Sequence, residues 1–287
     1  MHAPDADESR RGHAAGRDVS QCDAREPTFN GGASDPDAPR EGGWQVGTVI
    51  SSSDPVLAER IAQAFDFVWI DLEHSALSVR DAQMLAIAAK AGGARTLVRL
   101  PRSDSELLGA VLDAGVDAIV APKVDSAAQA ARLVHAVRYP PNGTRGFAPR
   151  RATGARATAG ALGSGHVGCV VQIETTEALG ELAAIAATDG VDALVVGTAD
   201  LSFDLGLPLD LNSAALISAI EEVGKAATRN GKPWGVAVGA LTDWVRHLRS
   251  AGASFVVFAS DAKLYAEAID ASAQQLRALD HEREAAV

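Results

Sequence analysis

The sequence predicts an α/β protein, a (β/α)₈ TIM barrel with a disordered N-terminal extension, on three observations. Eight short apolar runs alternate with Ala- and Leu-rich segments that have helical spacing. The runs are continuously apolar, as in parallel strands that helices cover. Residues 44–287 hold all eight runs and are close to the roughly 250 residues typical of such a barrel.

Residues 1–43 differ in composition from the rest of the chain. Between His2 and Gly43 there is no Leu or Ile, and Val19 and Phe29 are the only large apolar residues. Such a segment cannot bury enough apolar surface to offset the entropy that it would lose on ordering. We interpret it as a disordered tail, or equally as the product of a mis-assigned start codon, and place the barrel domain at residues 44–287.

The predicted strands and helices follow one another in the order that a barrel needs. The strands are residues 45–50, 66–71, 95–99, 117–121, 168–173, 192–196, 234–238 and 254–259. Residues 78–91 begin with Ser78 and Asp81, a helix-capping pattern, and end before two glycines. Further helices are predicted at residues 103–114, 125–137 and 213–229. An open doubly wound sheet is the alternative, but the first strand lacks the Gly-rich dinucleotide fingerprint of that fold.

Charge and cysteine content exclude several classes of protein. Asp and Glu number 37 against 26 Lys and Arg, and the formal net charge of −11 argues against binding to nucleic acid or an anionic membrane. Two cysteines, Cys22 and Cys169, exclude a disulfide scaffold and a cysteine-rich zinc site. No apolar run reaches the about 18 residues of a membrane span, and no secretory leader is visible, so we expect a cytoplasmic protein.

Polar side chains follow most of the strands, at the barrel end where catalytic residues gather. They include Asp71, Glu73, His74, Arg99, Lys123, Gln172, Glu174, Asp200 and Asp261. Glu174 and Asp200 follow neighbouring strands, and two carboxylates completed by water suit a divalent cation such as Mg²⁺ or Mn²⁺. The alternative is a carboxylate that pairs with Arg99 or Lys123, or that caps a helix.

His74 and Arg99 are the other candidate catalytic residues. A neutral imidazole at His74 can act as a general base near pH 7, unless it is a structural histidine bonded to Asp71 or Glu73. Arg99 can neutralise an oxyanion or a substrate carboxylate, or brace the same two acids, and both roles are compatible.

The segment Tyr139–Gly146 cannot be helical, and it leads into a long loop that ends near Gly165. Loops of this length more often have a function than serve only as connections. Its arginines, Arg145, Arg150 and Arg151, either meet an anionic substrate or offset the acidic strand ends. Cys169, inside a strand, is expected to be an inert core residue.

Four segments in this order resemble the HpcH/HpaI aldolase family, metal-dependent (class II) pyruvate aldolases related to the citrate-lyase β chain. They are residues 70–74 (IDLEH), 138–146 (RYPPNGTRG), 172–174 (QIE) and 196–202 (VGTADLS). Each segment alone is weak evidence for the family, but all four in this order are specific for it. The resemblance covers essentially residues 44–280.

The resemblance implies a metal and a substrate site. Glu174 and Asp200 match the ligands of a divalent cation (Mg²⁺, Mn²⁺ or Co²⁺), and Gln172 and Ala199, together with Asp200, match residues that contact the oxo acid. The implied activity is that of an aldehyde-lyase, which reversibly cleaves a 4-hydroxy-2-oxo acid to pyruvate and an aldehyde through a metal-stabilised enolate.

The resemblance also implies catalytic roles for three residues. Arg99 matches the arginine that stabilises the enolate, His74 the general base, and Asp113 the aspartate that raises the basicity of that base. No lysine Schiff base is needed, so Lys123 at the end of the fourth strand represents the less favoured class I alternative.

Departures from the family pattern leave the acceptor aldehyde open. Family members often have Pro where this chain has Thr198, and Met where it has Lys123, and residues 153–168 lack the expected aromatic and amide side chains. Two other functions therefore stay under consideration. One is a citrate synthase or citrate-lyase-like enzyme that acts on oxaloacetate and an acyl thioester, for example in siderophore synthesis. The other is a non-catalytic barrel that binds an anion.

Family resemblance also implies a homo-oligomer, a hexamer built from dimers that exchange the last helix. Residues 261–279 carry Leu264, Tyr265, Ile269 and Leu276 at a spacing suited to packing.

Overall fold

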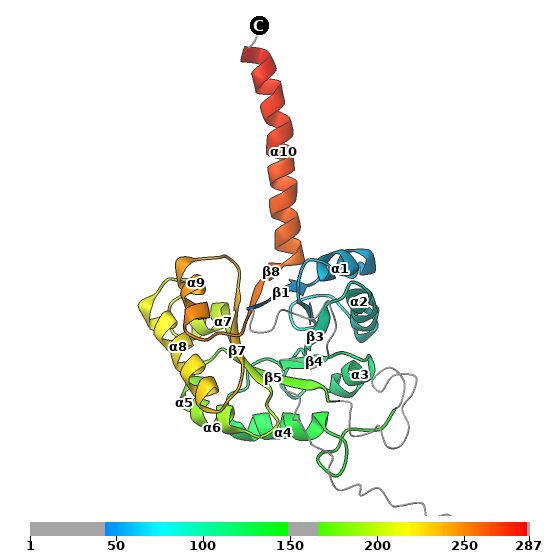
Figure 1. The fold of residues 1–287 in the computed structure, drawn as a ribbon, viewed down its shortest axis with the longest axis vertical. Coiled ribbons are helices and arrows are strands. Elements are labelled where there is room, and N and C mark those ends of the chain that lie inside the picture. Colours follow the sequence, from blue (N-terminus) through cyan, green and yellow to red (C-terminus); the bar gives the residue numbers. More distant parts are fainter. Residues whose placement is uncertain (1–43, 149–165, 286–287) are drawn as a thin grey trace, which may run out of the picture.

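A computed structural model of the chain describes residues 44–148 and 166–285, which form a barrel ringed by helices (Figure 1). The elements are β1 (Gln45–Ile50), α1 (Pro55–Ala62), β2 (Phe67–Asp71), α2 (Val79–Ala91), β3 (Arg95–Arg99), α3 (Leu108–Asp113), β4 (Ala118–Ala121), α4 (Ala127–Val137), β5 (Gly168–Ile173), α5 (Thr176–Gly180), α6 (Leu182–Ala187), β6 (Ala193–Gly197), α7 (Thr198–Asp204), α8 (Ala214–Arg229), β7 (Trp234–Val238), α9 (Asp243–Ser250), β8 (Phe255–Ser260) and α10 (Asp261–Ala285). The predicted tail, and the part of the predicted loop that holds Arg150 and Arg151, lie outside the described residues.

All eight strands are parallel, and each pairs with the next until β8 pairs with β1 and closes the barrel. Every strand begins and ends within one residue of its predicted range. The predicted (β/α)₈ TIM barrel is therefore confirmed. Closure brings the C-terminal ends of all eight strands to one edge of the barrel, which we call the rim.

Side chains alternate along each strand between the barrel interior and the layer beneath the helices. Phe67, Trp69, Leu97 and Val170 belong to the interior cluster, which is separate from the larger cluster between strands and helices. The larger cluster is built almost entirely from aliphatic residues, as the low aromatic content requires, and the interior cluster adds the aromatic rings of Phe67, Trp69 and Phe255. Cys169 is fully buried, and burial raises the pKa of its thiol to about 12, which fits the inert role expected of it.

Helices α2 and α4 each begin directly after a residue whose side chain caps the helix N-terminus. The Ser78 hydroxyl accepts the N–H of Asp81, and the Asp81 carboxylate accepts the N–H of Ser78, so the predicted capping box of α2 is confirmed. Helix α4 is capped by Ser126, one residue later than expected, because Asp125 binds the hydroxyl of Thr175 instead. Helix α3 begins at Leu108, later than predicted, because the preceding residues form hydrogen-bonded turns.

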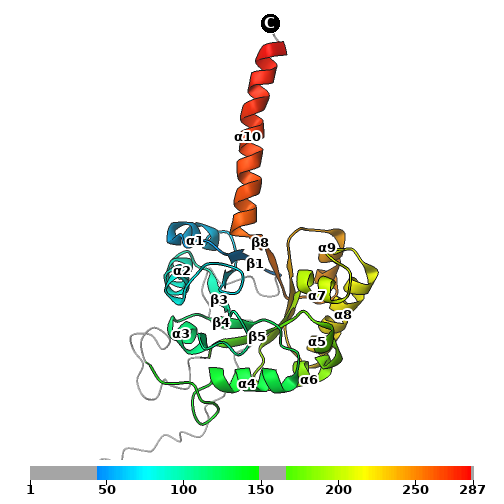
Figure 2. The same ribbon diagram turned by 180° about the vertical axis from the view of Figure 1, so that it is seen from behind.

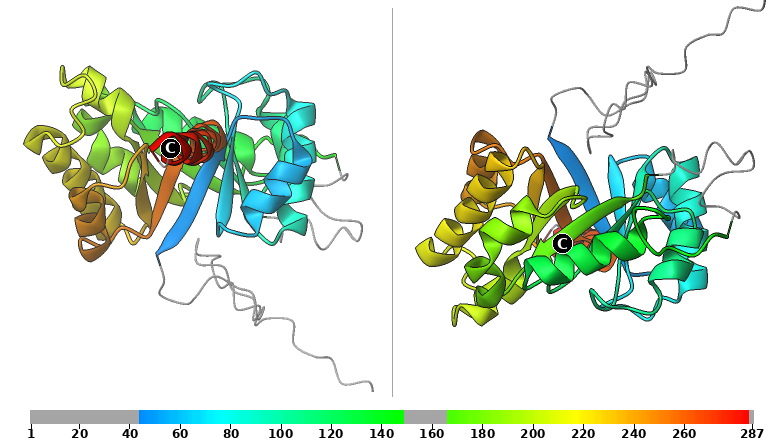
Figure 3. Two further views of the ribbon diagram at one scale, coloured as in Figure 1. Left: turned by 90° about the horizontal axis from the view of Figure 1, so that it is seen from above. Right: turned by 90° about the horizontal axis from the view of Figure 1, so that it is seen from below.

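Helix α10 extends away from the barrel, and its first residues contact β1 and β8 (Figures 1 and 2). Seen from above, it projects along the line of sight over the strands (Figure 3). The buried carboxylate of Asp261 fixes its start, because it accepts the backbone N–H groups of Ser51 (3.0 Å) and Ser52 (2.9 Å). Tyr265 and Ile269 are exposed on its surface.

Three aspartates join the strands at the end of the barrel opposite the rim. Each directly precedes an even-numbered strand and accepts the backbone N–H of the second residue of the strand before it. The pairs, which we call the aspartate clasps, are Asp66 with Val46 (2.8 Å), Asp117 with Thr96 (2.8 Å) and Asp192 with Cys169 (2.7 Å).

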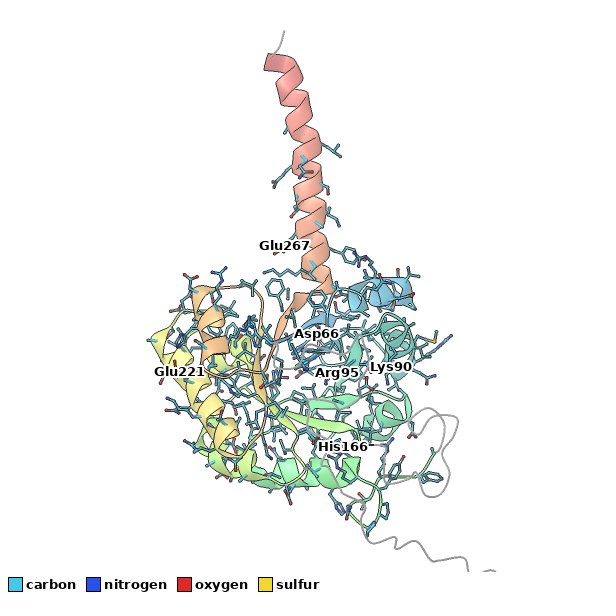
Figure 4. The ribbon with its side chains drawn as sticks, in the orientation of Figure 1. Asp66, Lys90, Arg95, His166, Glu221 and Glu267 are labelled. Carbon is cyan, nitrogen blue, oxygen red and sulfur yellow. The ribbon has the colours of Figure 1, made fainter. Side chains whose placement is uncertain are left out.

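Basic side chains balance the charge of the clasps. Lys90 lies 2.8 Å from Asp117, and Arg95 is attracted by both Asp66 and Asp117. Asp192 contacts Arg138 at 3.2 Å and His166 at 2.9 Å. Figure 4 labels Lys90 of α2 and Arg95 of β3, together with Asp66 and His166, which lie just before β2 and β5.

Within residues 44–148 and 166–285, no helix has both the length and the apolar character needed to cross a membrane.

We expect Asp192→Ala to lower the free energy of unfolding by about 2–3 kcal/mol, because the buried N–H of Cys169 loses its acceptor and Arg138 loses its acidic partner. Chemical denaturation measures this loss. Asp243→Ala is the control, since it removes an ion pair of 2.8 Å to Arg246 in which the carboxylate is fully exposed, and it should have little effect. Equal losses in the two variants would contradict a stabilising role for the clasp.

Candidate functional site

Five strands place polar side chains at the rim on one side of the barrel. Asp71 ends β2, with Glu73 and His74 just beyond it, and Arg99 ends β3. Lys123 follows β4, Glu174 follows β5, and Asp200 lies in the first turn of α7, directly after β6. Because neighbouring parallel strands end side by side, residues separated by more than a hundred positions in the sequence meet here.

Arg99 is the buried cation of this group. Its Nε donates to Oδ1 of Asp71 at 2.9 Å and its Nη2 to Oδ2 at 2.7 Å, a two-bond geometry that fixes the plane of the guanidinium. Its Nη1 lies 3.2 Å from Oε2 of Glu73, and the guanidinium carbon lies 5.5 Å from the ring centre of Trp69. Arg99 therefore braces both acids, one of the two roles that its position allows.

The two acids beside Arg99 respond differently to it. Burial would raise the pKa of Asp71, but the hydrogen bond and charge of Arg99, with the N–H groups of Glu73 and His74, outweigh burial and hold that pKa below its usual value. Burial raises the pKa of Glu73 above its usual value, despite the attraction of Arg99 and His74. Asp71 is thus the fixed anion of the site, and Glu73 the acid that protonates more readily.

His74 lies at the edge of the site and its side chain is exposed. Its Nε2 is 3.6 Å from Oε2 of Glu73, which in turn contacts Arg99. Asp113 is not brought beside it within the chain. It ends α3, which runs back from the rim, and its carboxylate contacts Nη2 of Arg145 at 3.5 Å.

Glu174 is held in a tight cradle beneath the rim. Its Oε1 accepts the backbone N–H of Lys123 at 2.8 Å, and its Oε2 accepts a short hydrogen bond from the side-chain amide of Gln172. Gly197 makes room for this contact, since a Cβ there would lie 2.4 Å from Oε2 of Glu174. Burial, followed by repulsion from Asp200, raises the pKa of Glu174 to about 7.

The donor set of this cradle fits a hard divalent cation. The carboxylates of Glu174 and Asp200 repel one another in the absence of a cation. The carbonyl oxygen of Gln172 is buried beside them and has no hydrogen-bond partner. Over the described parts of the chain, no cluster of three or more His, Cys, Asp or Glu side chains forms a metal site. Two protein carboxylates would leave coordination positions for water and an oxygen-bearing substrate.

Sequence reasoning missed three features of the site. Trp69 lies beneath Arg99, two residues before Asp71 on the same strand, and strand alternation is the signal that could have placed it inside. Gly197, the last residue of β6, permits the close approach of Glu174. Lys123 adopts a left-handed backbone conformation (φ 49°), which nothing in its sequence neighbourhood indicates.

An acid-rich rim around a buried arginine, at the C-terminal end of a TIM barrel, is the arrangement of an enzyme active site. A model of the HpcH/HpaI aldolase/citrate lyase family matches residues 45–268, and the chain belongs to this family.

Relatives and solved structures agree with that assignment. The chain is 38% identical over 223 residues to a 2-dehydro-3,6-dideoxy-6-sulfogluconate aldolase of Pseudomonas putida, covering 75% of this chain and 86% of the relative. It is 36% identical over 231 residues to a hydroxypyruvate/pyruvate aldolase of Deinococcus radiodurans (78% and 82% covered). A crystal structure of an HpcH/HpaI aldolase from Desulfitobacterium hafniense superposes with a TM-score of 0.78 at 27% identity (83% and 94% covered). The predicted family and the predicted aldolase class, a carbon–carbon lyase, are confirmed.

We expect the metal-free protein to lose stability between about pH 4.5 and pH 7 because of Glu174. Its folded pKa is raised, so the unfolded chain ionises first, and the stability present below pH 4.5 is lost as the pH rises through the folded pKa. At about 1.4 kcal/mol per pKa unit, the loss is about 3 kcal/mol. Urea denaturation in the presence of a chelator measures it. In Glu174→Gln this part of the pH dependence should vanish, and identical profiles for the two proteins would contradict the raised pKa.

Proposed function

We propose that the protein is a divalent-metal-dependent aldolase that reversibly cleaves a 4-hydroxy-2-oxo acid to pyruvate and an aldehyde. One observation carries the proposal: two mutually repelling carboxylates, Glu174 and Asp200, lie beside a buried, braced arginine at the rim. This combination suits the stabilisation of negative charge on an oxo acid. The names of the relatives, which are aldolases, support the same chemistry.

Glu174 and Asp200 are the proposed ligands of Mg²⁺, Mn²⁺ or Co²⁺. A divalent cation bound there supplies Lewis acidity toward the keto and carboxylate oxygens of the oxo acid. Gln172 and Ala199, with Asp200, are proposed to bind and orient the oxo acid.

Arg99 is proposed to stabilise the negative charge that develops on the oxo acid as the carbon–carbon bond breaks. The two hydrogen bonds that the guanidinium donates to Asp71 hold it in place before the reaction, so little reorganisation is needed when the charge appears. Burial alone would lower the pKa of Arg99, but Asp71, Glu73 and Glu174 raise it, and the side chain stays charged.

His74 is proposed to take the proton of the 4-hydroxyl group during cleavage and to return it in the condensation. Its exposed position suits exchange of that proton with solvent, and its Nε2 lies 3.6 Å from Oε2 of Glu73. Asp113, to which the family resemblance gives a role in raising the basicity of His74, lies elsewhere in its own chain, so that role requires a second copy of the protein.

The proposed function predicts that the enzyme exchanges the methyl protons of pyruvate with D₂O when Mg²⁺ or Mn²⁺ is present, and not with a chelator. Proton NMR measures this exchange.

Asp200→Asn should weaken metal binding at least tenfold, because a charged ligand is lost. Asp204→Asn is a matched control on the same helix and should bind metal as the wild type does, since Asp204 is exposed and bonds Thr176. Arg99→Lys should slow exchange about 100-fold or more through loss of a preorganised donor.

Two other outcomes would contradict parts of this proposal. Absence of exchange with any metal, combined with condensation of acetyl-CoA and oxaloacetate, would replace the aldolase by the citrate-type enzyme. Unchanged metal affinity in both Glu174→Gln and Asp200→Asn would show that the metal site is assigned to the wrong residues.

We further propose that the protein assembles through α10 into a dimer-based oligomer, with a hexamer as the expected state. The helix extends from the barrel with Tyr265, Ile269 and Leu276 exposed, between 45% and 68% of each, which is unfavourable for an isolated helix in water.

The assembly proposal predicts a mass above that of one chain in light scattering. The double substitution Ile269→Glu and Leu276→Glu should reduce that mass, since it places charges on the apolar surface of α10. Arg246→Glu, at an exposed position of α9, is the control and should leave the mass unchanged. A monomeric wild-type protein would refute the assembly.

A further inference from the structure

A hollow of about 520 Å³ lies on the outer surface of the barrel, between helices α8 and α9. Both helices lie on the side of the barrel away from α2 (Figures 1 and 2). Arg229, the last residue of α8, and Trp234, the first residue of β7, both line the hollow. Strands run toward the rim and helices run back from it, so these residues place the hollow toward the opposite end of the barrel. We call it the outer groove, and its lining includes no residue of the proposed active site.

Three basic side chains line the outer groove against one carboxylate. Lys225 and Arg229 come from α8, and His247 comes from α9. Glu221, which Figure 4 labels on α8, is the one acidic residue of the lining, and its Oε2 lies 3.8 Å from Nζ of Lys225. Over residues 44–148 and 166–285, Arg229 and His247 form no ion pair. The groove therefore presents a cation without an acidic partner, on a chain whose net charge is −11.

Trp234 brings a buried hydrogen-bond donor to the same groove. The residue is 1% exposed, and its indole N–H has no hydrogen-bond partner. A Cβ at Gly224 of α8 would lie 2.7 Å from Cε2, the ring carbon that is bonded to the indole nitrogen. Since Gly224 also lines the groove, the N–H edge of the ring lies against the part of α8 that borders it. A buried N–H without a partner gains free energy when an acceptor reaches it.

The remaining lining residues leave room and add little that could accept a hydrogen bond from a ligand. Gly224 and Ala251 have no side chain beyond Cβ, and the volume is within the about 300–1,000 Å³ of small-molecule sites. The Thr228 hydroxyl is engaged, because it donates to the carbonyl oxygen of Gly224 at 2.8 Å. Side-chain donors thus outnumber acceptors, and the lining favours a ligand rich in acceptor oxygens.

We propose that the outer groove is a second binding site, for a small molecule that carries a phosphate or carboxylate group. Arg229 presents the rigid fork of donors that suits such oxygens, with Lys225 and the indole N–H of Trp234 as further donors. Arg229 and His247 lie in the last turns of their helices, where cations also stabilise the helix ends. Trp234 has no such role, so its contribution distinguishes a binding site from ordinary helix-end charges. The proposal does not depend on the aldolase function.

The experiment measures binding of two dianions that differ in their charged groups. Isothermal titration calorimetry follows the binding of glycerol 3-phosphate and of glutarate to the full chain with Mg²⁺, and glycerol is the neutral control. We expect at least one dianion to bind with a Kd of about 1 mM or below, and glycerol not to bind. The dianion with the higher affinity identifies the charged group. Added salt should weaken its binding.

Two substitutions test the residues, each with a matched control. Arg229→Met should weaken binding of the dianion about tenfold to a hundredfold, the range for a lost hydrogen bond to a charged group. Arg80→Met, at an exposed position of α2, makes the same chemical change away from the groove and should bind as the wild type does. Trp234→Phe should weaken binding about tenfold. Trp244→Phe is its control, because Trp244 is also buried with an unpartnered N–H but does not line the groove.

The outcomes are separate from those of the proposed function. Binding that is weakened in Arg229→Met and Trp234→Phe, and kept in both controls, would establish the site, and metal-dependent exchange of pyruvate protons should be unchanged in Arg229→Met. Absence of binding for both dianions would refute the site, as would equal affinities in Arg229→Met and Arg80→Met. Weakening in Arg229→Met with no effect of Trp234→Phe would reduce the site to exposed surface charge and would also refute it.

Discussion

Closure of the parallel sheet, by pairing of β8 with β1, is the constraint on which the site depends. In a closed parallel barrel every strand delivers its C-terminal end to the same rim. Asp71 and Arg99, which end β2 and β3, then meet Glu174 and Asp200, which follow β5 and β6. A shift of one residue in the register of any of these strands would turn its final side chain from the rim toward the helices. The strand pairing therefore determines the geometry of the site.

The rim holds an excess of carboxylates around one buried arginine. Arg99 neutralises Asp71 and Glu73, and Glu174 and Asp200 are left to repel one another. That imbalance is the electrostatic reason why the metal-free site is costly to ionise and why a small divalent cation is the chemical species that it suits. The neutral backbone N–H of Lys123 and the amide of Gln172 hold Glu174 in position but do not remove its charge.

The strands and the order of rim residues could be predicted because both depend on local patterns. A continuous apolar run specifies a covered parallel strand, and the residue after it belongs to the rim. Contacts that depend on geometry between strands were beyond reach: the two bonds from Arg99 to Asp71, the Trp69 ring beneath it, and the approach of Glu174 to Gly197. The contact of Asp113 with Arg145 was also beyond reach, since a family motif assigns a role to a residue and does not specify its contacts.

The aspartate clasps have a consequence for how this fold can change over time. Asp66, Asp117 and Asp192 tie adjacent strands at the end opposite the rim, so closure does not depend on the loops that follow the strands. Loops at the rim can therefore be lengthened, shortened or exchanged while the scaffold persists. A mutant library confined to those loops is a sound starting point for directed evolution toward new aldehydes.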